Sequence, residues 1–568
     1  MSATSSVLCP RSLAWVAALV ALLACWAGAA PRQAKPHPDA AHAPAKSLLP
    51  QDVWKGQPAG PLAPGELDRL VDAELANAGI KPGPRASDEQ LLRRLYLDLT
   101  GHLPHADHVG PLVASQDPEK WNKLVDALLA SEAFNRHWAR YWRDVVLSGM
   151  HPDRQEMPRE FELWLANSLA EKKSWRQIAQ EALTAEGAVE PAQNGKNGAA
   201  FFLARHESAD ADVLRAAETS RVFLGIQIQC AQCHDHFFDR WKRVQFHELT
   251  GFFARLKPAQ PSGRGLKLVS LPDPEHEMAD QHKPSVLFTT HPRFLDGREP
   301  PRNLTDAARR KALADFVTGD ENYWFAASLV NRIWGELLGQ AFYQPEDDLG
   351  PDKTPAMPSV VVRLAAAFRA EGYDLRSLLR AIVRSETYRR QTRLGETSAA
   401  HLQFAAAYPA RLRSDVLLNA LGSALGPMGE SYYSRLFEAD YLYDPATNPD
   451  QVEGSIPQVL WLMNSSLINE RIRLRYIPKN PPPAEPGKPP RAPPEPNLVN
   501  RLLESTPDND QAIDEIYLRV LARRPTDRER TRCREHLKAV ADGKGNRAEG
   551  LEDLLWALVN STEFLRRR

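Results

Sequence analysis

The sequence predicts a mainly α protein, with two helical domains joined by a small β-rich connector. Three observations lead to this prediction. Apolar residues recur at helical spacing through most of the chain, and residues 324–338 are the clearest example. Between residues 257 and 300, Pro and Gly instead interrupt short apolar runs, which is typical of brief strands. A length of 568 residues with 43% hydrophobic content exceeds one ordinary core, so more than one domain is expected.

Residues 1–29 are typical of a signal peptide. Arg11 precedes an unbroken apolar run at 13–26, and Ala27-Gly28-Ala29 offers a cleavage site. The run is shorter than a typical membrane span, although an uncleaved anchor and a lipoprotein cut before Cys25 stay open as alternatives. We therefore expect an exported protein, periplasmic or at the cell surface, with no transmembrane span in the mature chain. Residues 30–62 are rich in Pro and Ala and are expected to form a flexible lead.

Residues 63–256 make up the first expected helical domain. A capping-box pattern at Ser87–Gln90 opens a strong helix that should stop at Gly101. Residues 185–200 are small and polar and are expected to form a loop. Apolar stripes predict further helices at 121–129, 135–147, 161–170, 175–183 and 210–223.

The β-rich connector at 257–300 leads into the second expected helical domain, residues 301–568. The acidic run Glu346-Asp347-Asp348 is expected to be a solvated turn. A Pro-dominated stretch at 478–497 has no hydrophobic period and is expected to be an extended or disordered insert. Helices are expected at 324–338, 360–368, 375–383, 509–521 and 551–564.

The one sharply chemical feature is the pentapeptide Cys230-Ala231-Gln232-Cys233-His234. Cys-x-x-Cys-His is the attachment signature for c-type haem. Two thiols three residues apart can bond to the two vinyl groups of one porphyrin, and His234 then presents its imidazole to the iron. With 5 Cys and 16 His in 568 residues, a chance match is expected about once in a thousand such chains. We therefore expect haem c as a cofactor, with Cys230, Cys233 and His234 as the residues that hold it.

The residues after the pentapeptide keep two other interpretations open. Asp235, His236 and Asp239 add an imidazole and two carboxylates, so the thiolates with a nearby imidazole, His247 included, also suit zinc or another transition metal. A lone Cys-x-x-Cys usually needs a second ligand pair, and Cys533 is distant in sequence. In the other interpretation the two cysteines form a short-loop disulfide, while the His and Asp residues cap helices or satisfy buried hydrogen bonds.

Other patterns carry less chemistry. Met150 and Met278 are candidate sixth ligands of a haem iron, and His102, His105 and His108 are expected to be a solvated cluster. The formal net charge of −1 gives no support for nucleic-acid binding, so no nucleic-acid partner is expected. The sequence contains no phosphate loop, dinucleotide fingerprint or Gly-x-Ser-x-Gly, and whether the protein is an enzyme stays open.

Two sets of motifs resemble known families. Residues 91–101 and the segment from Arg221 through the pentapeptide to Trp241 resemble the DUF1549 family, also called the planctomycete cytochrome-like PSCyt2 domain. Phe237 departs from that pattern, in which Pro or Lys is usual.

The second set of motifs resembles the DUF1553 family, or PSD1 domain. It includes Leu-Val-Asn-Arg-Ile-Trp at 329–334 and Pro-Glu-Asp-Asp-Leu-Gly at 345–350. Pro358-Ser359-Val360 lacks the His that this family usually has there, so a role carried by that His is not expected in this chain.

The resemblance implies an exported protein of planctomycete type that accompanies other exported proteins or a redox partner. It implies no established activity, because both families are named as unknown. We expect one c-type haem used for electron transfer or a linked redox step. The alternative is a non-haem, metal-binding or structural scaffold, or an interaction protein associated with carbohydrate use.

Overall fold

The computed structural model describes residues 56–148, 157–259, 265–393, 403–429, 431–448, 451–452, 454–477 and 495–567, together with strand β1 at Lys35–Pro36. The predicted signal peptide, most of the predicted flexible lead and residues 478–494 of the predicted Pro-rich insert lie outside these ranges. Helices dominate the described residues and the few strands are short, which confirms the predicted fold class. Within the described ranges, every helix is too short or too polar to traverse a lipid bilayer.

The N-terminal helices begin and end at local sequence signals. Ser87 and Gln90 form the predicted capping box, and the helix that they open stops at Gly101, whose φ of 70° is left-handed. Ser131 and Ser174 cap two later helices in the same way, each accepting a backbone N–H with its hydroxyl. The helices of this part are α2 (Glu66–Asn77), α3 (Asp88–Thr100), α4 (Ala106–Ala114), α5 (Lys120–Ala130), α6 (Glu132–Leu147), α7 (Met157–Ala170) and α8 (Trp175–Thr184).

Short elements follow, and they lead to the pentapeptide at residues 230–234, which we call the cysteine motif. The segment expected to be a loop at 185–200 contains the two-residue strand β2 (Ala188–Val189) and the single turn η4 (Gly198–Ala200). The elements after it are α9 (Phe201–Ala204), α10 (Ala211–Thr219), the π-helical turn η5 (Ser220–Leu224), the 3₁₀ turn η6 (Ile228–Gln232), α11 (Arg243–Thr250) and the 3₁₀ turn η7 (Gly251–Phe253).

Four strands occupy the predicted connector and build two small sheets. They are β3 (Leu256–Ala259), β4 (Leu266–Ser270), β5 (His276–Ala279) and β6 (Leu287–Thr290). Strand β4 pairs antiparallel with both β2 and β3, whereas β6 pairs antiparallel with β5 and parallel with β1. In β5, the side chains of His276 and Met278 point to the buried face, as the two-residue period of a strand requires.

The rest of the chain is helical. Its first group is α12 (Asp306–Val317), α13 (Tyr323–Leu338), α14 (Pro358–Ala370), α15 (Leu375–Val383) and α16 (Glu386–Arg389). Its second group is α17 (Ser414–Leu425), α18 (Tyr432–Tyr441), α19 (Ile456–Asn464), α20 (Ser466–Ile472), α21 (Leu498–Ser505), α22 (Asn509–Leu521), α23 (Asp527–Asp542), α24 (Arg547–Val559) and α25 (Thr562–Leu565).

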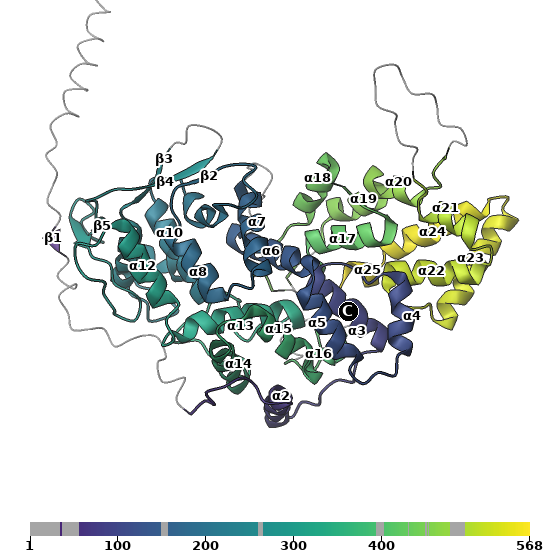
Figure 1. Cartoon of the computed structure of the whole chain (residues 1–568), viewed down its shortest axis with the longest axis horizontal. Helices are drawn as coiled ribbons and strands as arrows, with labels where there is room; N and C mark the ends of the chain where they lie inside the picture. The colour runs from purple at the N-terminus through teal and green to yellow at the C-terminus, as the bar shows by residue number, and fades with distance from the viewer. Residues whose placement is uncertain are drawn as a thin grey trace, which may run out of the picture.

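Two hydrophobic cores organise these elements. The larger core joins side chains of helices α2 to α16, so residues on both sides of the small sheets share it. The second core is built by α17 to α25, together with Leu97 and Leu103. Figure 1 shows the second group of helices on the side of the molecule away from the sheets, with α6 lying between the two. Burial of this kind stabilises the fold roughly in proportion to the apolar area removed from water, about 25 cal/mol per Å².

Candidate functional site

A left-handed turn at Gly225 connects helix α10 and the turn η5 to the cysteine motif. Helix α10 continues into the π-helical turn η5, which ends at Gly225 with φ 66°. A Cβ at this position would lie 3.0 Å from both Leu349 Cδ1 and Ser328 Cβ. The backbone carbonyl of Gly225 also accepts a hydrogen bond of 2.7 Å from the N–H of Leu349. Glycine is therefore required for the turn and for the close approach of the 345–350 segment.

Both cysteines of the motif are exposed and free. They lie on and just after the 3₁₀ turn η6, in which Ile228 and Ala231 are the buried residues. This arrangement turns the apolar side chains inward and both thiols toward solvent. The third cysteine, Cys533, is buried in α23, where its sulfur lies 3.9 Å from the hydroxyl of Tyr517. It is therefore packed in the second core rather than presented to the motif.

The ring of His234 has one nitrogen occupied. Its Nδ1 donates to the backbone carbonyl of Asp235 at 2.7 Å, so in a neutral imidazole the lone pair lies on Nε2. This is the tautomer of a typical metal-ligating histidine, whose other ring N–H is held by a carbonyl or carboxylate. The ring of Phe237 lies against the imidazole with centroids 4.1 Å apart, and Phe237 is itself 75% exposed.

The three polar residues that follow His234 hold the loop in place. Asp235 accepts from the ammonium of Lys242 at 2.9 Å and from the N–H of Arg243 at 3.0 Å, at the start of α11. Burial acts to raise the pKa of Asp235, but these two donors hold it below its usual range. His236 donates its backbone N–H to the carbonyl of Trp241, and its Nδ1 accepts from the N–H of Phe238 at 3.2 Å.

Asp239 meets a segment more than a hundred residues away in sequence. Its carboxylate accepts from the N–H of Arg240 at 2.7 Å and lies directly over Gly350, where a Cβ would come 1.7 Å from Oδ2. Burial and the nearby Asp352 raise the pKa of Asp239, although backbone N–H groups act to lower it. Arg240 pairs with Asp352 at 2.8 Å and donates to the carbonyl of Pro351 at 3.1 Å.

We call residues 345–352 the acidic turn. It packs against the cysteine motif and the residues that flank it. In addition to the contacts of Gly225, Asp239 and Arg240, the amide of Gln227 donates to Asp347 at 2.5 Å. The carboxylate of Asp347 also lies 3.6 Å from Arg221 and 3.6 Å from Arg332. The residues on both sides of the cysteine motif are thus held against the acidic turn.

The prediction that Glu346-Asp347-Asp348 is a solvated turn is wrong for its first two residues. Glu346 and Asp347 are only 6% and 3% exposed. Burial raises the pKa of Glu346 well above its usual range, although Arg332 acts to lower it. The carboxyl of Glu346 rests on Gly335 of α13, where a Cβ would lie 2.1 Å from Oε1. Burial thus favours the neutral form of Glu346, whereas the carboxylate of Asp347 lies near two arginines.

The described residues contain no group of three or more His, Cys, Asp or Glu side chains placed to hold a metal ion. Asp235, His236 and Asp239 make the structural contacts given above. The two ring nitrogens of His247 contact His276 and the backbone carbonyl of Gln232. Met278, a candidate sixth ligand, is buried beneath the sheet at 1% exposure, and Met150 lies outside the described ranges.

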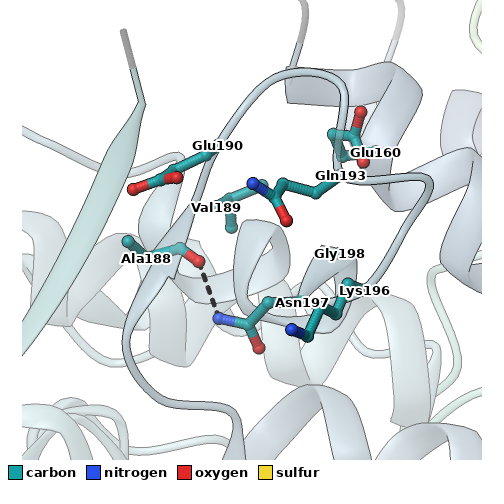
Figure 2. A pocket seen from close by; sticks show the side chains of 8 residues that line it. All are labelled: Glu160, Ala188, Val189, Glu190, Gln193, Lys196, Asn197 and Gly198. Carbon is teal, nitrogen blue, oxygen red and sulfur yellow. Dashed lines mark hydrogen bonds between the residues drawn. The ribbon is translucent and has the colours of Figure 1, made fainter. Parts of the chain in front are cut away.

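A cavity of about 380 Å³ opens elsewhere, between α7 and the 188–198 segment. Figure 2 shows the side chains that line it, with the amide of Asn197 donating to the carbonyl of Ala188. Glu160 is buried at its wall and accepts the N–H of Gly195 at 2.7 Å. None of the lining residues belongs to the cysteine motif or to the acidic turn.

Two family models match this chain, in the order that its motifs indicate. Residues 66–258 match PSCyt2, described as a protein of unknown function (DUF1549). Residues 309–439 match PSD1, described as a protein of unknown function (DUF1553). No curated protein and no solved structure matches the chain. The cysteine motif lies in the first matched region and the acidic turn in the second, so the two regions meet at this site.

Proposed function

This chain carries a DUF1549 (PSCyt2) domain followed by a DUF1553 (PSD1) domain, and we propose that it is an exported protein that holds one c-type haem for electron transfer or a linked redox step. Cys230 and Cys233 would hold the porphyrin through thioether bonds, and the imidazole of His234 would bind its iron.

The observation that carries this proposal is the state of the three attachment residues. Both thiols are free and face solvent, as attachment to a porphyrin requires. The Nδ1–H of His234 is held by a backbone carbonyl at 2.7 Å, so Nε2 presents its lone pair. Donor chemistry and tautomer therefore fit the group. The ring of Phe237 covers one face of the imidazole and must turn aside, which its 75% exposure permits.

The haem supplies the one-electron couple, and the chain's own residues set its position and surroundings. Asp235 and the acidic turn keep the loop in place, which preserves the orientation of the His234 ring. The carbonyl of Asp235 makes the imidazole of His234 a better donor by accepting its Nδ1–H. Phe237 and Phe238, which are 75% and 78% exposed, offer apolar surface to a porphyrin edge or to a redox partner.

A second candidate function is a non-haem scaffold or interaction protein. Here Cys230 and Cys233 bind zinc or another transition metal with one nearby imidazole, or they close a short disulfide. The close contact between the rings of Phe237 and His234 favours this candidate, because that contact leaves one face of the imidazole covered.

Absorbance of the mature protein separates the two functions. The chain is produced with haem-attachment machinery in an oxidising export compartment and purified under denaturing and native conditions. The haem proposal predicts a Soret band that stays with the denatured polypeptide and disappears in the Cys230→Ser/Cys233→Ser variant. A colourless protein that contains one zinc per chain by elemental analysis would establish the second candidate instead.

A further inference from the structure

The cavity between α7 and the 188–198 segment contains a buried carboxylate with one free oxygen. Glu160 lies in the first turn of α7 and is only 3% exposed. Its Oε2 accepts the N–H of Gly195 at 2.7 Å, whereas its Oε1 receives no hydrogen bond from any described residue. A buried carboxylate is costly unless donors or a cation compensate it. Because Glu160 lines the cavity, a molecule bound there can supply the missing donor.

The loop that walls the cavity is fixed in place. A Cβ on Gly198 would lie 2.1 Å from the backbone oxygen of Glu160, so the loop and α7 are in direct backbone contact. The amide of Asn197 donates both of its hydrogens, to the carbonyls of Glu186 at 2.9 Å and Ala188 at 2.7 Å. Its Oδ1 therefore stays available as an acceptor. A cavity that is already formed binds a small molecule without the cost of ordering a loop.

Opposite charges line the cavity without pairing. The carboxylates of Glu160 and Glu190 and the ammonium of Lys196 are all part of its lining. In the view of Figure 2, the two glutamates lie on one side of the cavity, and Lys196 and Asn197 lie on the other. Among the described residues, no ion pair joins Lys196 to either carboxylate. A ligand that carries both charges can therefore satisfy both sides.

The hydrogen-bonding groups of the lining define the class of ligand. Glu160 Oε1, the carboxylate of Glu190 and Asn197 Oδ1 only accept, and a primary ammonium group offers three donors and no acceptor. The ammonium of Lys196 only donates, so it requires an oxygen acceptor on the ligand. The volume of about 380 Å³ lies near the lower end of the range for small-molecule sites. A small zwitterion meets all of these requirements.

We propose that this cavity binds a free amino acid. The ammonium group of the ligand lies against Glu160 and Glu190, and its carboxylate lies against Lys196. The buried Val189 gives the cavity an apolar wall for the carbon atoms of the ligand. The site shares no residue with the cysteine motif, so this inference goes beyond the haem proposal and does not depend on it.

Isothermal titration calorimetry on the full chain tests the inference. Each common L-amino acid is titrated in turn. The tightest binder is then compared with its amide, which lacks the carboxylate, and with its deaminated acid, which lacks the ammonium group. We expect one site per chain, and we expect each analogue to bind about tenfold more weakly, as for the loss of one charged partner.

Three variants assign the two ends of the ligand. Lys196→Met, at an exposed position that tolerates substitution, should weaken binding of the amino acid about tenfold and leave binding of the amide unchanged. Glu160→Gln replaces the free carboxylate oxygen by a donor and should weaken binding of both. Lys172→Met, at an exposed lysine outside the cavity, is the matched control and should change neither affinity.

Several results would overturn the inference. They are the absence of binding by every amino acid, equal affinities of the wild type and Lys196→Met, and an equal loss of affinity in Lys172→Met. Binding of a neutral polyol such as glucose in place of any amino acid would also overturn it. Calorimetry is done on protein with no haem attached, so failure of this inference and failure of the haem proposal are distinguishable.

Discussion

The contact between Gly350 and Asp239 predicts that Gly350→Ala loosens the cysteine motif. A Cβ on Gly350 would lie 1.7 Å from Oδ2 of Asp239 and 2.9 Å from its Cγ. The φ of Gly350 is not positive, so alanine can adopt its backbone conformation. The effect must therefore come from displacement of the Asp239 carboxylate.

The size of the effect follows from the bonds that the carboxylate makes. It accepts the N–H of Arg240 at 2.7 Å and a backbone hydrogen bond from Asp352. Each such bond contributes about 1 kcal/mol, so local opening of the motif should become easier by about 1–2 kcal/mol. Hydrogen exchange of residues 236–241 should then accelerate about 5- to 30-fold.

The Asp239→Ala background supplies the control. Without the carboxylate, the closest remaining neighbour of the new Cβ is Cγ of Lys353 at 3.4 Å, which is ordinary contact. Gly350→Ala should then add little to the exchange rate, so the two substitutions should be strongly non-additive. If Gly350→Ala speeds hydrogen exchange equally in both backgrounds, or does not speed it in the wild type, then the acidic turn does not hold the cysteine motif in place.

Three further predictions concern the same region and its neighbours. Gly335→Ala should destabilise the protein by about 1–3 kcal/mol, because its Cβ would meet the buried carboxyl of Glu346 at 2.1 Å; an unchanged thermal midpoint would count against that packing. Burial raises the pKa of Glu248 to about 7, so the native state binds more protons at this carboxyl than the unfolded state does, and stability should fall as the pH rises from about 4.5 to about 7. Glu248→Gln should lack this fall. Thermal midpoints of the wild type and the variant that change in parallel with pH would refute the assignment. The pKa of Asp235 is lowered, so its stabilising contacts at the start of α11 are present above the usual carboxylate range and are lost in acid. Asp235→Asn should speed hydrogen exchange at residues 234–243 at neutral pH and match the wild type at low pH. A difference that persists in acid would argue against this role.

The sequence predicted the helices that have an apolar stripe or a cap. The helix opened by Ser87 and ended by Gly101 is one example, and α13, which begins one residue before the predicted segment, is another. Strand β2 was missed because two residues are too few to show a period. Helix α23 was missed because its sequence is almost uniformly polar and only Cys533 and Leu537 are buried.

The site was predictable only as far as local sequence reaches. The three attachment residues follow from one motif, but the roles of Asp235 and Asp239 depend on α11 and on the acidic turn. The contact between Asp212 and His276 was missed because residues 64 positions apart carry no shared pattern; they meet through α11, which packs against both α10 and β5. Asp347 looked like a surface charge because Arg221 and Arg332, which approach its carboxylate, lie elsewhere in the sequence, and the burial of Glu346 against Gly335 is likewise a contact between distant residues.

The stoichiometry of covalently bound haem shows whether Cys230 and Cys233 attach a porphyrin. The intact mass of the mature chain, produced with haem-attachment machinery, is compared with that of the Cys230→Ser/Cys233→Ser variant. The wild-type mass is expected to exceed that of the polypeptide by one haem, and the variant mass is expected to equal that of the polypeptide alone. A wild-type chain with the bare polypeptide mass, under conditions that load a known c-type cytochrome, would contradict the haem proposal.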